Sequence, residues 1–305
     1  MGMFNNLFKD IPTENRIANK STIVLEQEKD IAYSKSGIDG KYIVENVDVF
    51  NFKNITQKFG DFKLFDNFNL DIKDFKGKGQ FISIMGASGC GKSTLLKYLA
   101  GLSKPDNGQI LHYGKEMTEK DNIPMIFQQY SSFDWMTVLE NVSLPMKMKG
   151  ISKEEREEKA MKLIELVGLK GQENKWAKMP PLSGGQLQRV ALARSLSAGS
   201  NIILLDEYSS GLDIFSKHSM QDTLLDVFYN SELDPTFINV GHDISECVYL
   251  SDRIYILTAN PCTVHSVIDI DFGDIKRNSE IRQTKTFNDY LTRIEEIMFE
   301  INKKK

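Results

Sequence analysis

The feature that most limits what this chain can fold into is a glycine-rich loop between a buried strand and a helix. Gln80 to Met85 is an apolar run of strand length, and Ser93 to Leu99 carries apolar residues at helical spacing. The stretch between them, Gly86-Ala-Ser-Gly-Cys-Gly-Lys-Ser-Thr94, fits the pattern GxxxxGK[ST]. Glycines in this pattern let backbone N–H groups turn inward at a helix N-terminus, where they bind phosphate oxygens. The strand, loop and helix together predict a phosphate-binding site.

Two side chains of this loop have predicted chemical roles. Lys92 would reach the β- and γ-phosphates of a nucleotide, and the Ser93 hydroxyl would ligate Mg²⁺. We expect nucleotide contacts along the whole loop, from Gly86, Ala87, Ser88, Gly89, Cys90, Gly91, Lys92, Ser93 and Thr94.

A second apolar strand, Ile202 to Asp206, ends in the acids Asp206 and Glu207. Burial of the strand fixes its backbone, so Asp206 can hold Mg²⁺ or its water while Glu207 faces an attacking water. Hydrophobic strands that end in an acid are common. In combination with the phosphate loop, this one indicates a nucleotide-hydrolysing site.

The periodicity of the rest of the chain predicts an α/β protein. Short runs at Val44 to Phe52, Ile55 to Phe59 and Phe62 to Ile72 indicate an antiparallel β-subdomain. Strands then alternate with helices, which predicts a mostly parallel sheet. The strands of this alternation are expected at Ile202 to Asp206, Thr236 to Val240 and Arg253 to Leu257, and two further strands are expected near Gly108 to His112 and Ile123 to Phe127. The expected helices are Lys153 to Val167, Gly184 to Ser197, Ile214 to Tyr229 and Asp243 to Leu250, followed by one amphipathic helix from Asn278 to Lys305.

Composition narrows the class of protein. A net charge of -4 in 305 residues argues against nucleic acid as the principal ligand. No apolar stretch approaches the roughly 20 residues of a spanning helix, so we expect the chain itself not to cross a membrane. The first residues lack the pattern of a secretory signal and of a myristoylation site. Cys90, Cys247 and Cys262 are widely spaced and odd in number, which favours unpaired thiols in a reducing cytosol.

The string Leu182-Ser-Gly-Gly-Gln186, followed by Leu-Gln-Arg-Val-Ala-Leu-Ala-Arg194, resembles the signature motif of ABC (ATP-binding cassette) ATPases. Physically it is a second anion-binding helix start. The resemblance implies that these residues of one subunit close over the γ-phosphate of an ATP held by another subunit. They are Ser183, Gly184, Gly185 and Gln186.

Four further residues match the family in order along the chain. Gln128 resembles the glutamine that senses Mg²⁺ and water, and Asp213 the aspartate that works across the dimer interface. His242, which follows Glu207 by 35 residues (242 minus 207), resembles the switch histidine that contacts the γ-phosphate. Phe59 resembles the aromatic residue that stacks on adenine. The resemblance thus implies Glu207, His242, Gln128 and Lys92 as catalytic residues and Ser93, Gln128 and Asp206 as metal ligands.

The resemblance covers about residues 43 to 270 and implies a domain organisation. We expect a P-loop NTPase cassette at residues 43–272, with a mostly parallel core sheet, an antiparallel β-subdomain and a helical subdomain at about 129–198. An N-terminal extension, residues 1–42, has no assigned role, and residues 273–305 form a helical tail.

Three stretches are similar to the ATPases of nitrate, sulfonate and taurine importers: Trp135 to Val142, His242 to Arg253 and Leu257 to Pro261. This similarity implies MgATP hydrolysis at the interface of a head-to-tail dimer of two copies, which drives a separate permease. A substrate-binding protein would take part indirectly. The expected location is peripheral, at the cytoplasmic face of the inner membrane.

Two departures from the family pattern leave an alternative open. Tyr208 stands where proline is usual and Gly241 where threonine or serine is usual, and both would loosen the alignment of Glu207 and His242. The alternative is a non-transport or regulatory ABC ATPase with weak hydrolysis. ABC ATPases of DNA repair carry a long coiled coil between the phosphate loop and the signature, whereas only 91 residues (183 minus 92) separate Lys92 from Ser183. Translation-type ABC proteins carry two cassettes, and this chain carries one.

Overall fold

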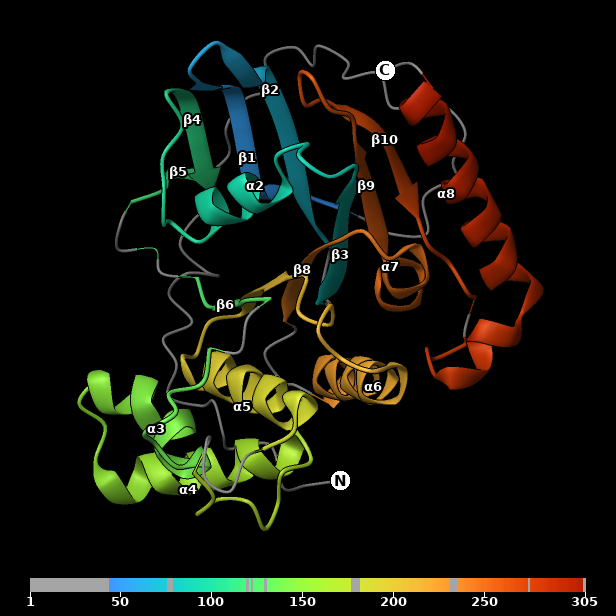
Figure 1. Cartoon of the computed structure of the whole chain (residues 1–305). Coiled ribbons are helices and arrows are strands. Elements are labelled where there is room, and N and C mark those ends of the chain that lie inside the picture. Colours follow the sequence, from blue (N-terminus) through green and yellow to red (C-terminus); the bar gives the residue numbers. More distant parts are fainter. Residues whose placement is uncertain are drawn as a thin grey trace.

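The structure of the chain is a computed structural model (Figure 1). The structure describes residues 44–75, 79–118, 121, 123–128, 131–176, 182–230, 235–273 and 275–303. The N-terminal extension expected at residues 1–42 lies outside them.

The core is a six-stranded sheet in the order β10-β9-β3-β8-β7-β6. Strands β9, β3, β8, β7 and β6 are parallel, and β10 pairs antiparallel with β9. The mostly parallel sheet expected from the alternation of strands and helices is therefore present. The strands are β3 (Gln80–Gly86), β6 (Met125–Ile126), β7 (Ile202–Asp206), β8 (Thr236–Gly241), β9 (Arg253–Leu257) and β10 (Val264–Asp269).

Alternation along the core strands separates two hydrophobic clusters, because successive side chains point to opposite faces of a sheet. Ile82, Ile84 and Leu204 pack with α2 (Lys92–Leu99) and the antiparallel sheet. Phe81 and Leu205 pack instead with the helices on the other face. These helices are α5 (Gly184–Ser197), α6 (Ile214–Asn230), α7 (Ile244–Leu250) and α8 (Lys285–Lys303).

The second sheet has the order β2-β1-β4-β5 and is antiparallel. Its strands are β1 (Val44–Phe59), β2 (Phe62–Phe75), β4 (Asn107–His112) and β5 (Lys115–Glu116). Strand β1 runs on through the point where the sequence predicted a break between Phe52 and Ile55. Asn54 takes a left-handed conformation there (φ 53°), and the register with β2 shifts, so the irregularity is absorbed as a bulge.

A helical layer lies below the core sheet in the view of Figure 1. It consists of α3 (Val138–Met148) and α4 (Lys153–Leu166), which pack on each other and on α5. Helix α3 begins with a capping box, in which Thr137 accepts from the Glu140 N–H and the Glu140 side chain accepts from the Thr137 N–H. Ser152 caps α4 as expected, through a hydrogen bond from the N–H of Glu155.

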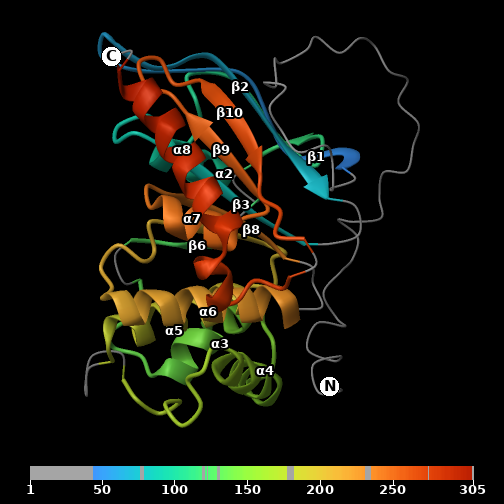
Figure 2. The ribbon, with the colours of Figure 1, turned by 90° about the vertical axis from the view of Figure 1, so that its right-hand side faces the viewer.

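The C-terminal tail is two elements rather than the single helix expected from Asn278. A 3₁₀ helix, η1 (Ser279–Gln283), is followed by α8. Thr284 separates them: its backbone is extended (φ -76°, ψ 151°), and its hydroxyl accepts from the N–H of Phe287 at the start of α8. Figure 2 shows α8 lying along β9 and β10, where Ile294 is fully buried in the same cluster as Ile254 and Ile268.

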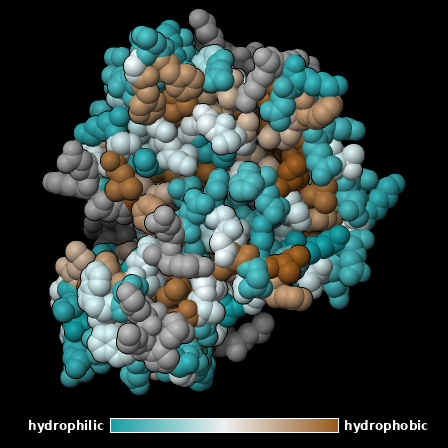
Figure 3. Space-filling view, in the orientation of Figure 1, coloured by the Kyte–Doolittle hydropathy of each residue, from teal (hydrophilic) through white to brown (hydrophobic). Residues whose placement is uncertain are grey.

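Within the described residues, no helix combines the length and hydrophobicity that crossing a membrane requires. On the face shown in Figure 3, hydrophobic side chains form several separate patches among hydrophilic ones.

Candidate functional site

Sites predicted far apart in the sequence meet at one edge of the core sheet. Met85 pairs with Gly241, Asp206 with Val240, and Leu205 with Ile126, all in parallel register. Because parallel strands end at the same edge, the residues that follow them are brought together. These are the phosphate loop after β3, Glu207 after β7, His242 after β8 and Gln128 after β6.

The side chain of Lys92 lies inside the phosphate loop. Nζ of Lys92 donates to the carbonyl oxygens of Gly86 (2.8 Å) and Ala87 (3.2 Å), and the residue is only 7% exposed. Helix α2 begins at Lys92, after the N-cap Gly91, whose φ of 102° favours glycine, and no side chain caps this end. The first N–H groups of α2 thus lack a side-chain acceptor, which suits a phosphate.

The loop is packed too tightly for larger residues at two of its glycines. A Cβ on Gly91 would lie 2.7 Å from the ring of Phe65, and one on Gly86 would lie 2.7 Å from Sγ of Cys90 and 2.9 Å from the carbonyl oxygen of Leu257. Cys90, Cys247 and Cys262 are buried, and no disulfide joins any of them. Burial raises the pKa of Cys247 and Cys262, so both remain protonated near neutral pH.

Asp206 lies where a Mg²⁺ ligand is expected. Burial raises the pKa of its carboxyl, and the neighbouring charge of Glu207 raises it further. The charges of Lys97 and Lys92 and a hydrogen bond with the Ser93 side chain lower this pKa in turn. A partly buried carboxylate beside a hydroxyl is a hard-oxygen donor set, so these residues fit Mg²⁺.

Glu207 and His242 form a pair. Nδ1 of His242 lies 3.3 Å from Oε1 of Glu207, and the imidazole is 68% exposed against 26% for the carboxylate. Glu207 has a left-handed backbone (φ 43°), which is rare for a residue other than glycine and persists only when neighbouring contacts hold it. One such contact is the hydrogen bond from its N–H to the carbonyl oxygen of Val240 (3.0 Å).

Tyr208 is held in the core. It is fully buried, and its carbonyl oxygen accepts from Nε2 of Gln188 at 2.8 Å. Burial, reinforced by the charge of Glu246, raises the pKa of the phenol well above its ordinary value. Gly241 is likewise fixed as the last residue of β8, with its φ outside the left-handed range. Both positions are thus held by defined contacts, and their effect on the alignment of Glu207 and His242 during turnover stays a prediction.

Sequence reasoning missed three residues that hold this segment. Gln188 also donates to the carbonyl oxygen of Phe127 (3.4 Å), so it ties the signature helix to the residues next to Gln128 and Glu207. Ser209 donates to Oε2 of Glu246 at 2.5 Å. Gln188 and Glu246 stand inside the quoted family strings, but no spacing rule indicates which backbone or side-chain atoms they reach.

Phe59 and Gln128 are both exposed. Phe59 is 58% exposed and pairs with Phe62 across the turn between β1 and β2. Farther along β2, Phe65 contacts Gly91, so this hairpin borders the phosphate loop. Gln128 follows β6 at the same edge as Asp206. Their roles toward adenine and Mg²⁺ stay predictions.

The signature residues lie at the start of α5, which packs on the sheet face opposite α2. The Ser183 hydroxyl accepts from the N–H of Gln186 (3.3 Å), and the Gln186 side chain accepts from the N–H of Ser183 (2.9 Å). A Cβ on Gly185 would lie 3.4 Å from Ser216 of α6. This end of α5 therefore contacts the start of α6, next to Asp213.

Asp213 acts locally as a helix cap. Its Oδ1 accepts from the N–H groups of Phe215 and Ser216 (both 3.0 Å), and its Oδ2 accepts from the Ser216 hydroxyl (2.6 Å). The Ser216 hydrogen bonds hold the pKa of this carboxyl below its usual range. Its expected role across a dimer interface stays a prediction.

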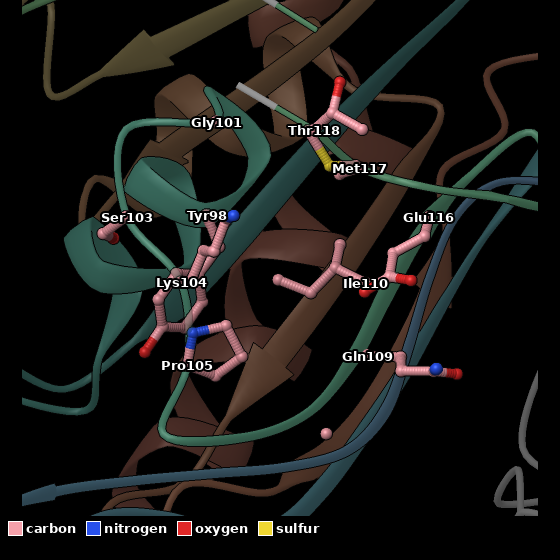
Figure 4. A pocket seen from close by; sticks show the side chains of 11 residues that line it. Tyr98, Gly101, Ser103, Lys104, Pro105, Gln109, Ile110, Glu116, Met117 and Thr118 are labelled. Atoms are coloured by element: carbon pink, nitrogen blue, oxygen red, sulfur yellow. The ribbon is translucent and has the colours of Figure 1, made fainter. Parts of the chain in front are cut away.

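A further pocket of about 140 Å³ lies at the opposite end of α2 from the phosphate loop (Figure 4). Tyr98, Ile110 and Met117 line it. It is separate from the edge of the sheet where the predicted site residues gather.

Comparison with known sequences gives a consistent result. The family model described as "ABC transporter" matches residues 65–210. The uncharacterized ABC transporter ATP-binding protein MJ0412 of Methanocaldococcus jannaschii is 41% identical over 68% of this chain and 76% of its own length. The aliphatic sulfonates import ATP-binding protein SsuB of Bacillus cereus is 37% identical over 71% and 82%. The taurine import ATP-binding protein TauB of Roseobacter denitrificans is 35% identical over 75% and 83%.

Solved structures agree with the sequence relatives. The dimeric post-hydrolysis structure of the ATP-binding cassette MJ0796, bound to ADP and Pi, superimposes with a TM-score of 0.61 at 31% identity. The match covers 73% of this chain and all of that one.

Proposed function

The chain belongs to the ABC transporter family, as an ATP-binding subunit that hydrolyses ATP, and from that premise we propose that it powers a small-molecule importer. The observation that carries the proposal is the meeting of Lys92, Asp206, Glu207 and His242 at one edge of the core sheet.

The position of each of these side chains supports a proposed role. Glu207 is the base that orients and deprotonates the attacking water, and His242 contacts both this carboxylate and the γ-phosphate. Lys92 exchanges its carbonyl partners Gly86 and Ala87 for the β- and γ-phosphate oxygens when ATP binds. Ser93, Asp206 and Gln128 would hold Mg²⁺, which supplies positive charge to the phosphoryl oxygens as the bond breaks.

We propose that two copies form a head-to-tail dimer with an ATP at each of two interfaces. Ser183 begins a helix on the sheet face opposite α2, and its hydroxyl and Gln186 cap each other at an exposed helix N-terminus. An exposed helix start of this kind binds anions. Closure would bring it against the phosphate loop of a second copy, so that neither half-site is complete alone.

The transported solute is proposed from relatives. The names of two relatives specify import of aliphatic sulfonates and of taurine, at 37% and 35% identity. We therefore propose a small organic or inorganic anion of the nitrate, sulfonate and taurine kind. A separate permease and a binding protein would select it, and the chain would sit on the cytoplasmic face of the membrane.

Substitution of the base tests the mechanism. Glu207→Gln keeps the shape of the side chain but not its basicity, so MgATP should still bind while turnover falls by about a hundredfold or more. The trapped species should be a dimer that gel filtration with light scattering detects in MgATP but not in MgADP. Wild-type turnover in Glu207→Gln would contradict the assignment of the base.

Co-purification tests the importer. The tagged chain should bring down a membrane permease whose addition raises ATPase turnover. Vesicles with both proteins and the binding protein should accumulate taurine or an alkyl sulfonate on addition of ATP. An ATPase that binds no permease would favour the regulatory alternative.

A further inference from the structure

A series of four side chains connects the backbone after Glu207 to the C-terminal part of the chain. Ser209 Oγ donates to Oε2 of Glu246 (2.5 Å), and Nε2 of Gln221 donates to the same oxygen (3.0 Å). Nη2 of Arg282, on η1, then donates to Oε1 of Gln221 (2.6 Å). We refer to Ser209, Glu246, Gln221 and Arg282 as the relay.

The relay is buried at the end nearest the site. Ser209 is 5% exposed, Glu246 3% and Gln221 1%. A buried carboxylate requires hydrogen bonds or an opposite charge. Glu246 has both, because Nζ of Lys217 lies 3.7 Å from the oxygen that accepts the two hydrogen bonds. The geometry of Glu246 is therefore defined from several sides.

Arg282 is fixed at the other end of the relay. Its guanidinium lies over the ring of Tyr249, 3.6 Å from the ring centroid. The Tyr249 hydroxyl in turn donates to Oδ1 of Asp222 (2.6 Å) on the same helix as Gln221. The C-terminal segment thus contacts α6 through Gln221 and α7 through Tyr249, close to Glu246.

The strained backbone at Glu207 needs neighbouring contacts, and the relay supplies one of them. A left-handed residue that is not glycine costs conformational free energy and needs neighbours that hold it in place. The residue after it is held through Gln188, and Ser209 is the second residue after it. If Ser209 lost its hydrogen bond to Glu246, the backbone would lose one of the contacts that keep the Glu207 carboxylate directed toward His242.

We propose that the relay positions the catalytic glutamate: Arg282 acts through Gln221, Glu246 and Ser209 to hold the backbone after Glu207 in the alignment that hydrolysis requires. The C-terminal segment is then part of the hydrolytic machinery and not only a cover of the sheet. The inference rests on the proposed role of Glu207 as the base.

The test uses full-length protein with Ser209→Ala, Arg282→Met and the double variant. Each single variant should lower kcat by about tenfold while the Kd for MgATP stays within about twofold, because phosphate binding uses other residues. The double variant should fall no further than the worse single one, since both break the same series of contacts. Arg282→Lys, which keeps a donor, should recover part of kcat. Gln283→Met, an exposed neighbour on η1, is the control and should match wild type.

Two outcomes would overturn the relay. One is unchanged kcat in Arg282→Met, and the other is a double variant whose losses multiply, as they do for independent sites. A parallel Glu207→Gln measurement separates the two proposals. If that variant loses turnover and Arg282→Met does not, the relay fails alone. If Glu207→Gln retains turnover, the assignment of the base fails.

Discussion

Oε1 of Glu207 and Nδ1 of His242 lie 3.3 Å apart, although 35 residues separate them in the sequence (242 minus 207). The pairing follows from strand order, because β7 and β8 are parallel neighbours and both residues lie just past the paired part of their strands. The proposed hydrolytic site therefore depends on the register of two strands as well as on two side chains. Each of the following predictions concerns a contact that fixes this arrangement or the elements around it.

Replacement of His242 should uncouple nucleotide binding from turnover. His242→Ala removes the partner of the Glu207 carboxylate, so kcat should fall by about a hundredfold or more, as for the loss of other acid–base partners. The Kd for MgATP should change by much less, since Lys92 and the phosphate loop remain. His218→Ala, at an exposed position on α6, is the matched control. Equal losses in kcat and in affinity would show that His242 mainly binds nucleotide.

A methyl group at Gly241 should stabilise the chain. The nearest atoms to a Cβ there are Nδ2 of Asn239 and Oε1 of Glu246, both at 3.7 Å, which is ordinary van der Waals contact. Alanine loses less conformational freedom than glycine on folding, so Gly241→Ala should raise the free energy of unfolding by about 0.5–1 kcal/mol. Urea unfolding measures this difference. Destabilisation instead would mean that Glu246 or Cys247 has to move to make room.

Gln188, in the signature helix, donates to residues that lie after β6 and after β7, and it should be costly to replace. Gln188→Met keeps the length of the side chain but leaves the carbonyl oxygen of Tyr208 without its donor. An unsatisfied buried carbonyl costs about 1–3 kcal/mol, so the free energy of unfolding should fall by that amount. Gln109→Met, at an exposed position of β4, should leave the free energy of unfolding unchanged. An equal effect of both variants would show that the Gln188 contact contributes nothing specific.

The parts of the molecule that the sequence predicted well are those set by local patterns. The phosphate loop, the acids at Asp206 and Glu207 and the order of strands follow from glycine spacing and apolar runs, and the sheet register then brings them together. Contacts such as Arg282 to Gln221 join positions 61 residues apart. They depend on how α6 and η1 pack, and periodicity carries no information about that packing.

The ends of strands and helices also depend on tertiary contacts that sequence periodicity does not predict. One hydroxyl at Thr284 divides the predicted C-terminal helix, and one left-handed residue at Asn54 lets β1 continue where a break was expected. Threonine and asparagine are compatible with either outcome, because both also occur inside helices and strands as exposed residues. The tertiary contacts on each side decide between the alternatives.

The cap at Asp213 predicts a stability effect that is separate from any role between two copies. Asp213→Ala removes acceptors from Phe215 and Ser216 at the start of α6, so the midpoint of thermal unfolding should fall by about 2–4 °C. Because hydrogen bonds hold the pKa of this carboxyl below its usual range, its contribution is full above the unfolded-state pKa. That contribution is lost as pH falls through the lowered pKa. The wild type and Asp213→Ala should therefore differ at neutral pH and converge in strong acid, which thermal unfolding at a series of pH values measures. A difference that appears only in the MgATP-trapped dimer would contradict the cap and place the effect of Asp213 at the interface.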